Sequence, residues 1–217
     1  MANYLAVLLL GIISKINGHF HSDFRICGTE QYMQDMFDKY PEWKAKLNQF
    51  DIDHASTHSN AATASVGNPG MNRIVFPVRY HILFNKFTGE ENVPDSTIAF
   101  QNARLQLDYS AMNPDRNTTP PVFISPVDLR SGDFGFTFLN AQTIRKATDV
   151  CVFSFFGNDI KFDSMGGSDV IKPETNLNFW SGALEGGLLG YAQFPGGNPI
   201  TDGVVHLWDT LSPEVGG

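Results

Sequence analysis

The 217 residues suffice for one domain with an appendage, and 42% hydrophobic residues with 18 phenylalanines can build a substantial core, which excludes a disordered chain. The 15 basic and 23 acidic residues give a formal net charge of -8. Lysine and arginine form no cluster that could track a phosphate backbone, so we expect no nucleic acid partner.

The N-terminal region contains an apolar run from Leu5 to Ile13, which is too short to span a bilayer as a helix. Its length fits the core of a secretory signal peptide, and the small Gly18 favours cleavage after that residue. We therefore predict a signal peptide over residues 1–18, a secreted, extracellular product and no membrane partner. An N-glycosylation sequon at Asn117 agrees with this compartment.

Residues 19–70 are predicted to form a pro-segment and linker apart from the main core. The pattern from Glu30 to Phe50 is helical, with a break at Pro41. Asp51 to Gly70 contains almost no large apolar residue. This composition predicts a linker and a natural site for proteolytic nicking.

Residues 71–217 are predicted to form the main domain. Its first strand, Arg73 to Asn85, contains Pro77, which favours an edge position or a bulge near the start of the strand. Residues 93–96 provide cap chemistry for a helix that continues to about residue 112. The apolar face of this helix consists of Ile98, Leu105, Tyr109 and Met112.

Short apolar runs bounded by glycine and proline predict further strands. They are Phe134 to Leu139, Asn176 to Trp180, Leu188 to Gln193 and Gly203 to Trp208. Together these elements predict an α/β fold, a twisted mixed five-stranded sheet with one main long helix, preceded by a small helical pro-segment. The two cysteines, Cys27 and Cys151, could form one disulfide that ties the N-terminal segment to the domain.

Several short motifs follow one another after the predicted signal peptide. They are Cys27-Gly28-Thr29, residues 113–120 (NPDRNTTP), 161–169 (KFDSMGGSD), 177–180 (LNFW), 188–196 (LLGYAQFPG) and 201–205 (TDGVV). In order and rough spacing the series resembles the pappalysin-like (cytophagalysin) branch of the metzincin zinc metalloproteases. The resemblance implies a metzincin-like N-terminal catalytic subdomain of a secreted zinc metalloendopeptidase, which hydrolyses peptide bonds with a zinc-activated water.

The resemblance also implies a role for the strand that begins at Leu188. In metzincins the matching segment is the edge strand above the cleft, whose free N–H and C=O groups pair with an extended peptide or protein substrate. Its residues here are Leu188, Leu189, Gly190, Tyr191, Ala192 and Gln193. A plain β-hairpin with a solvated edge is the alternative.

The motif that would carry catalysis in such an enzyme, H-E-x-x-H-x-x-G-x-x-H, is absent from the sequence. Its first two histidines bind zinc from one helix face and its glutamate serves as general base. Glu214-Val215-Gly216 resembles the interior of the motif, but Pro213 and Gly217 stand where the two histidines would be. We therefore expect a fragment or inactive form, with no catalytic residue and no zinc bound by this chain alone.

Four other histidines are weaker candidates for metal binding. His54 and His58 have the i, i+4 spacing of a helical chelate, but they lack the intervening glutamate and fall in the predicted linker. His81 and His206 fall inside predicted strands. We expect these two to be satisfied by the sheet rather than by a metal.

The resemblance gives Cys27 a second interpretation. Cys-Gly-Thr in a pro-segment is typical of a cysteine switch, in which the thiolate occupies the open zinc position until the pro-segment is cut away. A Cys27–Cys151 disulfide would prevent this, and both interpretations stay open. A function of a different class is also open, namely a non-catalytic secreted peptide-binding module or decoy that uses the edge strand.

Overall fold

The computed structural model describes residues 26–58, 73–118, 133, 135–154, 156–194 and 196–211. The predicted signal peptide, residues 59–70 of the predicted linker and the tail from Ser212 to Gly217 lie outside this part of the chain.

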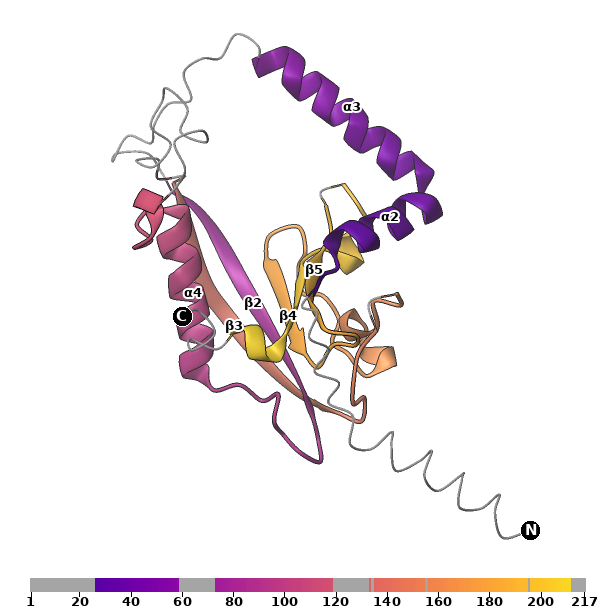
Figure 1. The fold of residues 1–217 in the computed structure, drawn as a ribbon, viewed down its shortest axis with the longest axis vertical. Helices are drawn as coiled ribbons and strands as arrows, with labels where there is room; N and C mark the ends of the chain where they lie inside the picture. The colour runs from indigo at the N-terminus through magenta and orange to yellow at the C-terminus, as the bar shows by residue number, and fades with distance from the viewer. Residues whose placement is uncertain are drawn as a thin grey trace, which may run out of the picture.

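A mixed sheet of six strands forms the centre of the described structure, in the order β1-β5-β6-β4-β2-β3 (Figure 1). Neighbouring strands are parallel, except that β5 runs antiparallel to β6. The strands are β1 (Ile26–Cys27), β2 (Ile74–Asn85), β3 (Phe136–Thr148), β4 (Leu177–Gly182), β5 (Leu188–Ala192) and β6 (Val204–Leu207). The α/β class is confirmed. The predicted count of five strands is wrong, because β1 joins the sheet from the N-terminal segment.

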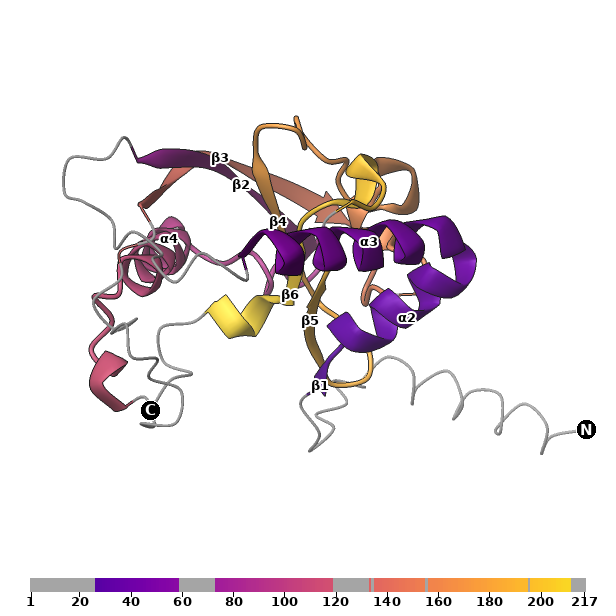
Figure 2. The ribbon, with the colours of Figure 1, turned by 90° about the horizontal axis from the view of Figure 1, so that it is seen from above.

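Two helices of the N-terminal segment, α2 (Thr29–Lys39) and α3 (Pro41–His58), meet at the predicted break. A residue before proline is disfavoured in the α region, and Tyr40 leaves it with φ -133° and ψ 74°. The helix α3 continues to His58, so the predicted linker is wrong for residues 51–58. Figures 1 and 2 both show the two helices as a V whose α2 arm lies beside β5.

The helix α4 (Asp95–Tyr109) connects β2 to the parallel β3 and completes a βαβ unit. Pro94 is its N-cap and no side chain caps it, so the predicted side-chain cap is wrong. Ile98 is buried and Leu105 packs against the same core, as predicted. Tyr109 and Met112 remain 41% and 66% exposed, so only the first part of the predicted apolar face is buried.

Pro77 lies where β2 has a neighbour on one side only. The pairing of β2 with β4 begins at Val78, and the pairing with β3 shifts register between Val78 and Arg79. A proline has no N–H to donate, so this position costs the sheet no hydrogen bond on the open side. The predicted edge or bulge at Pro77 is confirmed.

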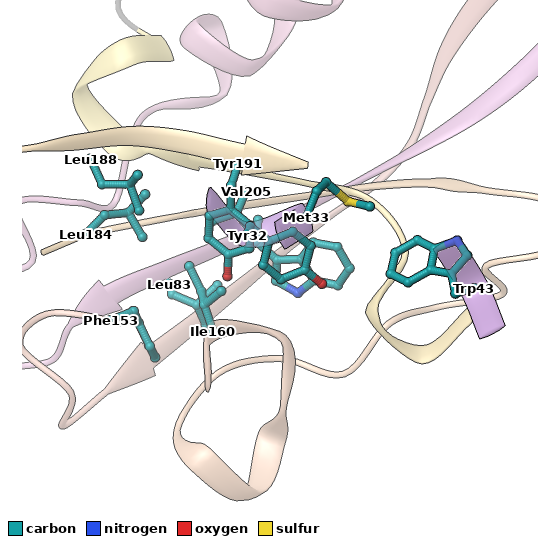
Figure 3. Packing of buried hydrophobic residues seen from close by; sticks show 11 residues of the cluster. Tyr32, Met33, Trp43, Leu83, Phe153, Ile160, Leu184, Leu188, Tyr191 and Val205 are labelled. Carbon is teal, nitrogen blue, oxygen red and sulfur yellow. The ribbon is translucent and has the colours of Figure 1, made fainter. Parts of the chain in front are cut away.

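The two faces of the sheet carry separate hydrophobic clusters. One cluster packs against α4 and contains Val78, Tyr80, Ile82, Val93, Ile98, Phe138, Phe179 and Leu211. The other, drawn in Figure 3, includes residues of the N-terminal segment as well as of the sheet. Its members are Tyr32, Met33, Trp43, Leu83, Phe153, Ile160, Trp180, Leu184, Leu188, Tyr191 and Val205. The N-terminal segment is therefore part of the core.

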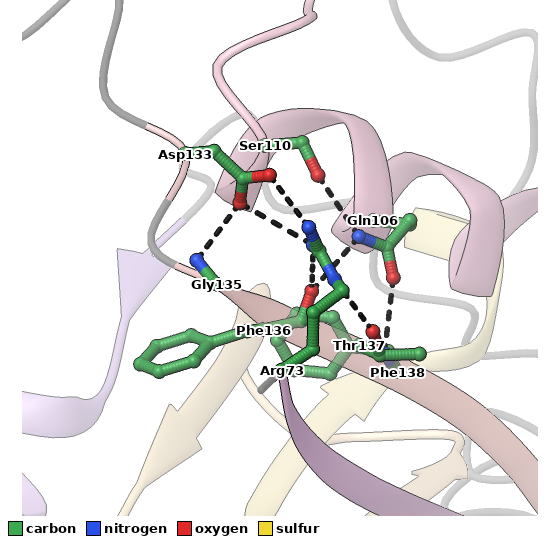
Figure 4. Close-up of polar contacts among 8 residues, drawn as sticks. All are labelled: Arg73, Gln106, Ser110, Asp133, Gly135, Phe136, Thr137 and Phe138. Carbon is green, nitrogen blue, oxygen red and sulfur yellow. Dashed lines mark hydrogen bonds and ion pairs between the residues drawn. The ribbon is translucent and has the colours of Figure 1, made fainter. Parts of the chain in front are cut away.

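Polar contacts hold the outer strand β3 to α4 and to the start of β2 (Figure 4). The side chain of Gln106 donates to the C=O of Phe136 at 3.0 Å and accepts from the N–H of Phe138 at 3.1 Å. Arg73 pairs with Asp133 at 2.6 Å. Because β3 lies at the end of the sheet, these bonds satisfy backbone groups that no further strand reaches.

Candidate functional site

The predicted strand from Leu188 is present as β5, which ends at Ala192, one residue before the predicted Gln193. It is the second strand of the sheet, so its outer groups are not free in this structure. It pairs antiparallel with β6 on one side, and its other side faces away from the main domain. Leu188 and Tyr191 point into the core, whereas Leu189 and Ala192 are half-buried. Gly190 allows the close approach of β6, since a Cβ there would lie 2.4 Å from the carbonyl oxygen of Val205.

The outer side of β5 is occupied by the N-terminal segment. The N–H of Ile26 donates to the C=O of Gly187 at 3.0 Å, and the N–H of Gly28 donates to the C=O of Gly190 at 2.8 Å. The N–H of Ala192 donates to Thr29 Oγ1 at 3.1 Å. Backbone groups of Gly187, Gly190 and Ala192 are thus paired by residues 26–29, and the two backbone bonds are of the kind that an added strand makes with a sheet edge.

Helix α2 continues this cover past the end of the strand. The N–H of Phe194 lies 3.3 Å from the sulfur of Met33, which is buried. Trp43 of α3 is also buried and packs on the loop after β5, where a Cβ on Gly197 would lie 2.6 Å from Trp43 Cζ2. The segment from β1 to the start of α3 therefore covers both the edge and the adjoining loop.

Both cysteines are free and exposed, so the predicted Cys27–Cys151 disulfide is not formed in this structure. Cys27 belongs to β1, whereas Cys151 accepts a hydrogen bond from Asn85 at the end of β2. The strands β5, β6 and β4 lie between β1 and β2. Hydrogen bonds from Thr29 lower the pKa of the Cys27 thiol, which favours the thiolate.

An open hollow of about 410 Å³ lies beside Cys27 and α2. Its lining comes from β1, from α2 and from the loop that follows β5. The residues are Cys27, Thr29, Glu30, Met33, Gln34, Phe37 and Phe194. The Cys27 thiol is therefore accessible from this side.

A buried lysine lies under the N-terminal segment, and the sequence did not indicate it. Lys161 is fully buried and its Nζ donates to the C=O of Thr201 at 2.6 Å. The ammonium lies 5.4, 5.5 and 5.1 Å from the ring centres of Tyr32, Trp180 and Tyr191. Desolvation lowers the pKa of Lys161 to about 7, while the charge of Asp202 opposes that shift.

The sheet histidines are placed in two different ways. His81 is stacked on Trp180 at 4.9 Å, and its ring nitrogens lie 2.8 Å from Ser168 Oγ and 3.0 Å from Asn178 Oδ1. It is satisfied by the fold, as predicted. His206 lies next to Phe179, and its buried Nε2 has no partner among the described residues. Burial lowers the pKa of His206 to about 4.

The residues that the structure describes do not fit a zinc ion. Among them, no group of three or more histidine, cysteine, aspartate or glutamate side chains is arranged to hold a metal. His81 has both nitrogens engaged, and His206 has no second ligand beside it. His54 and His58 lie in α3, and their side chains are outside the described part.

Two further sequence features can be placed. Asn117 lies exposed in a short 3-10 helix, Arg116–Thr118, so its side chain is accessible. Within the described residues, no helix combines the length and the apolar character needed to cross a membrane.

No protein-family model and no curated protein sequence matches the chain, but solved structures do. Promirolysin from Tannerella forsythia, in a mutant form, is 27% identical over 85% of this chain, with a TM-score of 0.64. Mature mirolysin from the same organism, in complex with a cleaved peptide, is 29% identical over 64% of this chain, with a TM-score of 0.55.

A third structure, mirolysin in complex with a compound, is 30% identical over 64% of this chain, with a TM-score of 0.55. The chain spans 54% to 60% of the length of these structures. Mirolysin is a metalloprotease. The strand order, the antiparallel β5 and these similarities together show that the chain has a metallopeptidase-like fold.

Proposed function

We propose that this chain is the precursor form of part of a secreted, pappalysin-like zinc metalloendopeptidase, in which β5 binds extended peptides and residues 19–70 act as the pro-segment. The observation that carries the proposal is the pairing of β1 with the outer side of β5. An extended segment already lies where a peptide substrate would pair.

The comparisons support the precursor form in particular. Promirolysin matches 85% of this chain, whereas mature mirolysin matches 64%. A chain that includes a pro-segment would show such a difference, because the mature enzyme has nothing for that segment to match. Cys27, free, exposed and with a lowered pKa, has the chemistry of a cysteine-switch residue.

Peptide-bond hydrolysis is assigned to no residue of this sequence. The H-E-x-x-H motif is absent from the 217 residues, and the described side chains do not fit zinc. Zinc in the family enzyme would polarise the scissile carbonyl and activate a water. The role that we propose for this chain is the one its own residues can perform, namely to bind and orient an extended peptide along β5.

A displacement assay tests the binding role. The full chain is nicked with elastase between α3 and β2, and a fluorescent peptide that copies residues 24–40 is exchanged into it. Reduced casein, an unfolded protein, should then compete with the labelled peptide. The intact chain is the control and should exchange about a hundredfold less, because its own segment is tethered at high effective concentration. If casein never competes, β5 is not a general peptide-binding edge.

The second candidate, a secreted binding module without catalysis, is supported by the same edge and the same absence of the motif. Sequencing the transcript through and beyond the codon for Gly217 separates the two. An open reading frame that continues into H-E-x-x-H supports the peptidase. A stop codon directly after Gly217 supports the binding module.

A further inference from the structure

Tyr32 of α2 is held by the main domain in a way that resembles a bound ligand. The ring is 2% exposed and lies beside the ring of Tyr191 (Figure 3), with 5.0 Å between the two ring centres. Lys161 Nζ lies 5.4 Å from the centre of the Tyr32 ring. Its hydroxyl donates to Gln193 Oε1 at 3.4 Å and accepts from Asn158 Nδ2 at 3.1 Å. Both the face and the polar end of the phenol therefore have dedicated contacts.

The walls of this site are held in place without help from Tyr32. The Trp180 ring donates to the C=O of Ser168 at 2.7 Å and stacks on His81. Lys161 is fixed at both ends, since its backbone N–H donates to the C=O of Asn158 at 2.8 Å and its Nζ to the C=O of Thr201. Such a framework is preorganised for a ligand.

The polar end of the site is also fixed by the main domain. Thr201 Oγ1 donates to Gln193 Oε1 at 2.6 Å, and Gln193 Nε2 donates to the C=O of Asn198 at 3.0 Å. Asn158 is only 6% exposed, and among the described residues its Oδ1 has no hydrogen-bond partner. The Nδ2 of the same side chain donates to the phenol oxygen, and an apolar side chain would leave this buried donor without an acceptor.

We propose that Lys161, Trp180, Tyr191, Asn158 and Gln193 form a binding site for a tyrosine side chain, which Tyr32 fills here and which a tyrosine-bearing peptide fills when the N-terminal segment leaves. The ligand class follows from the contacts. A phenylalanine would leave Asn158 Nδ2 without the acceptor that the phenol oxygen supplies, and a lysine or arginine would bring a second positive charge to Lys161. The release of the segment rests on the proposed function, but the site itself does not.

Chemical rescue tests the site in the intact chain. The variant Tyr32→Ala removes the phenol and leaves its cavity, and p-cresol, the tyrosine side chain as a free molecule, is added at about 5 mM with toluene as the matched apolar probe. We expect p-cresol to raise the melting temperature of the variant by about 4 °C, and toluene to raise it by at most half as much. Phe37→Ala, on the same helix, is the control and should not respond to p-cresol.

An equal effect of p-cresol and toluene, or no effect of either, would overturn the proposal, because the site would then lack selectivity for the hydroxyl or collapse when it is emptied. This readout needs neither metal, nor proteolysis, nor release of the segment, so its failure is distinguishable from a failure of the proposed function.

A second measurement does not depend on the stability of Tyr32→Ala. In the elastase-nicked full chain, unlabelled peptides that copy residues 24–40 compete with the labelled one. We expect the peptide with phenylalanine for Tyr32 to compete about tenfold more weakly, and the peptide with alanine more than about a hundredfold more weakly. Equal competition by the tyrosine and phenylalanine peptides would contradict a site for the phenol.

Discussion

At the scale of single residues, burial decides what the polar side chains of this chain can do. Lysine is normally a charged surface residue, yet Lys161 is fully buried. Its Nζ is surrounded by aromatic rings and one carbonyl oxygen. His206 is partly covered, and its Nε2 is buried without a partner in the described part of the molecule. A buried imidazole that lacks an acceptor resists protonation, which links its environment to stability.

We predict that His206 makes the folded state sensitive to mild acid. Its pKa is lowered from 6.5 to about 4, so between these values the unfolded chain binds a proton that the folded chain does not. The stabilisation is fully present above pH 6.5 and is lost as the pH falls toward 4. When the pH is lowered from 7 to 5, the free energy of unfolding measured in urea should fall by about 2 kcal/mol less in His206→Phe than in the wild type. Equal losses in the two chains would show that His206 takes up a proton as readily in the folded chain as in the unfolded chain.

At the scale of elements, β1 consists of two residues and has little intrinsic stability, so its place depends on its partner. Its bonds to β5 continue through Thr29, the first residue of α2. The hydroxyl of Thr29 serves two neighbours, since it accepts from the N–H of Ala192 and lies 3.6 Å from the sulfur of Cys27. One side chain thus contacts both β5 and the Cys27 thiol.

We predict that Thr29→Val, which keeps the shape and removes the hydroxyl, affects both neighbours. The amide of Ala192 should exchange its hydrogen about tenfold faster, because it loses its acceptor. The backbone hydrogen bond of residue 29, the larger cause of the lowered Cys27 pKa, stays in the variant, whereas the side-chain hydrogen bond is lost. Alkylation of Cys27 by iodoacetamide at pH 7 should therefore become modestly slower. Thr143→Val, in β3 at the opposite edge, is the control. Unchanged exchange at Ala192 would mean that Thr29 Oγ1 is not its acceptor in solution.

At the scale of the whole molecule, the N-terminal segment behaves as a ligand of the main domain that is joined to it covalently. It contributes β1 to the sheet and Tyr32, Met33 and Trp43 to one hydrophobic cluster. Residues 59–70 are mostly small or polar and contain no lysine or arginine, so elastase rather than trypsin is the protease to cut there.

We predict that the two pieces remain together after elastase cleavage, because the buried contacts of the segment persist. They should elute together in gel filtration at micromolar concentration and separate in guanidinium chloride. Trp43→Ala should weaken the association at least about a hundredfold, as expected for loss of a buried tryptophan. Phe50→Ala, at a position that is 60% exposed, should leave it unchanged. Immediate separation of the wild-type pieces would show that the segment is not docked in solution.

The sequence by itself determined the features that depend on local pattern. Pro41 separates α2 from α3 because proline excludes the preceding residue from a helix, and the alternation of apolar runs with one long helix indicates the βαβ unit. Only the tertiary structure decided the pairing of β1 with β5, because a strand of two residues has no periodicity to detect. It also decided that Lys161 is buried and that Cys27 and Cys151 lie apart, because both depend on contacts between residues far apart in the chain.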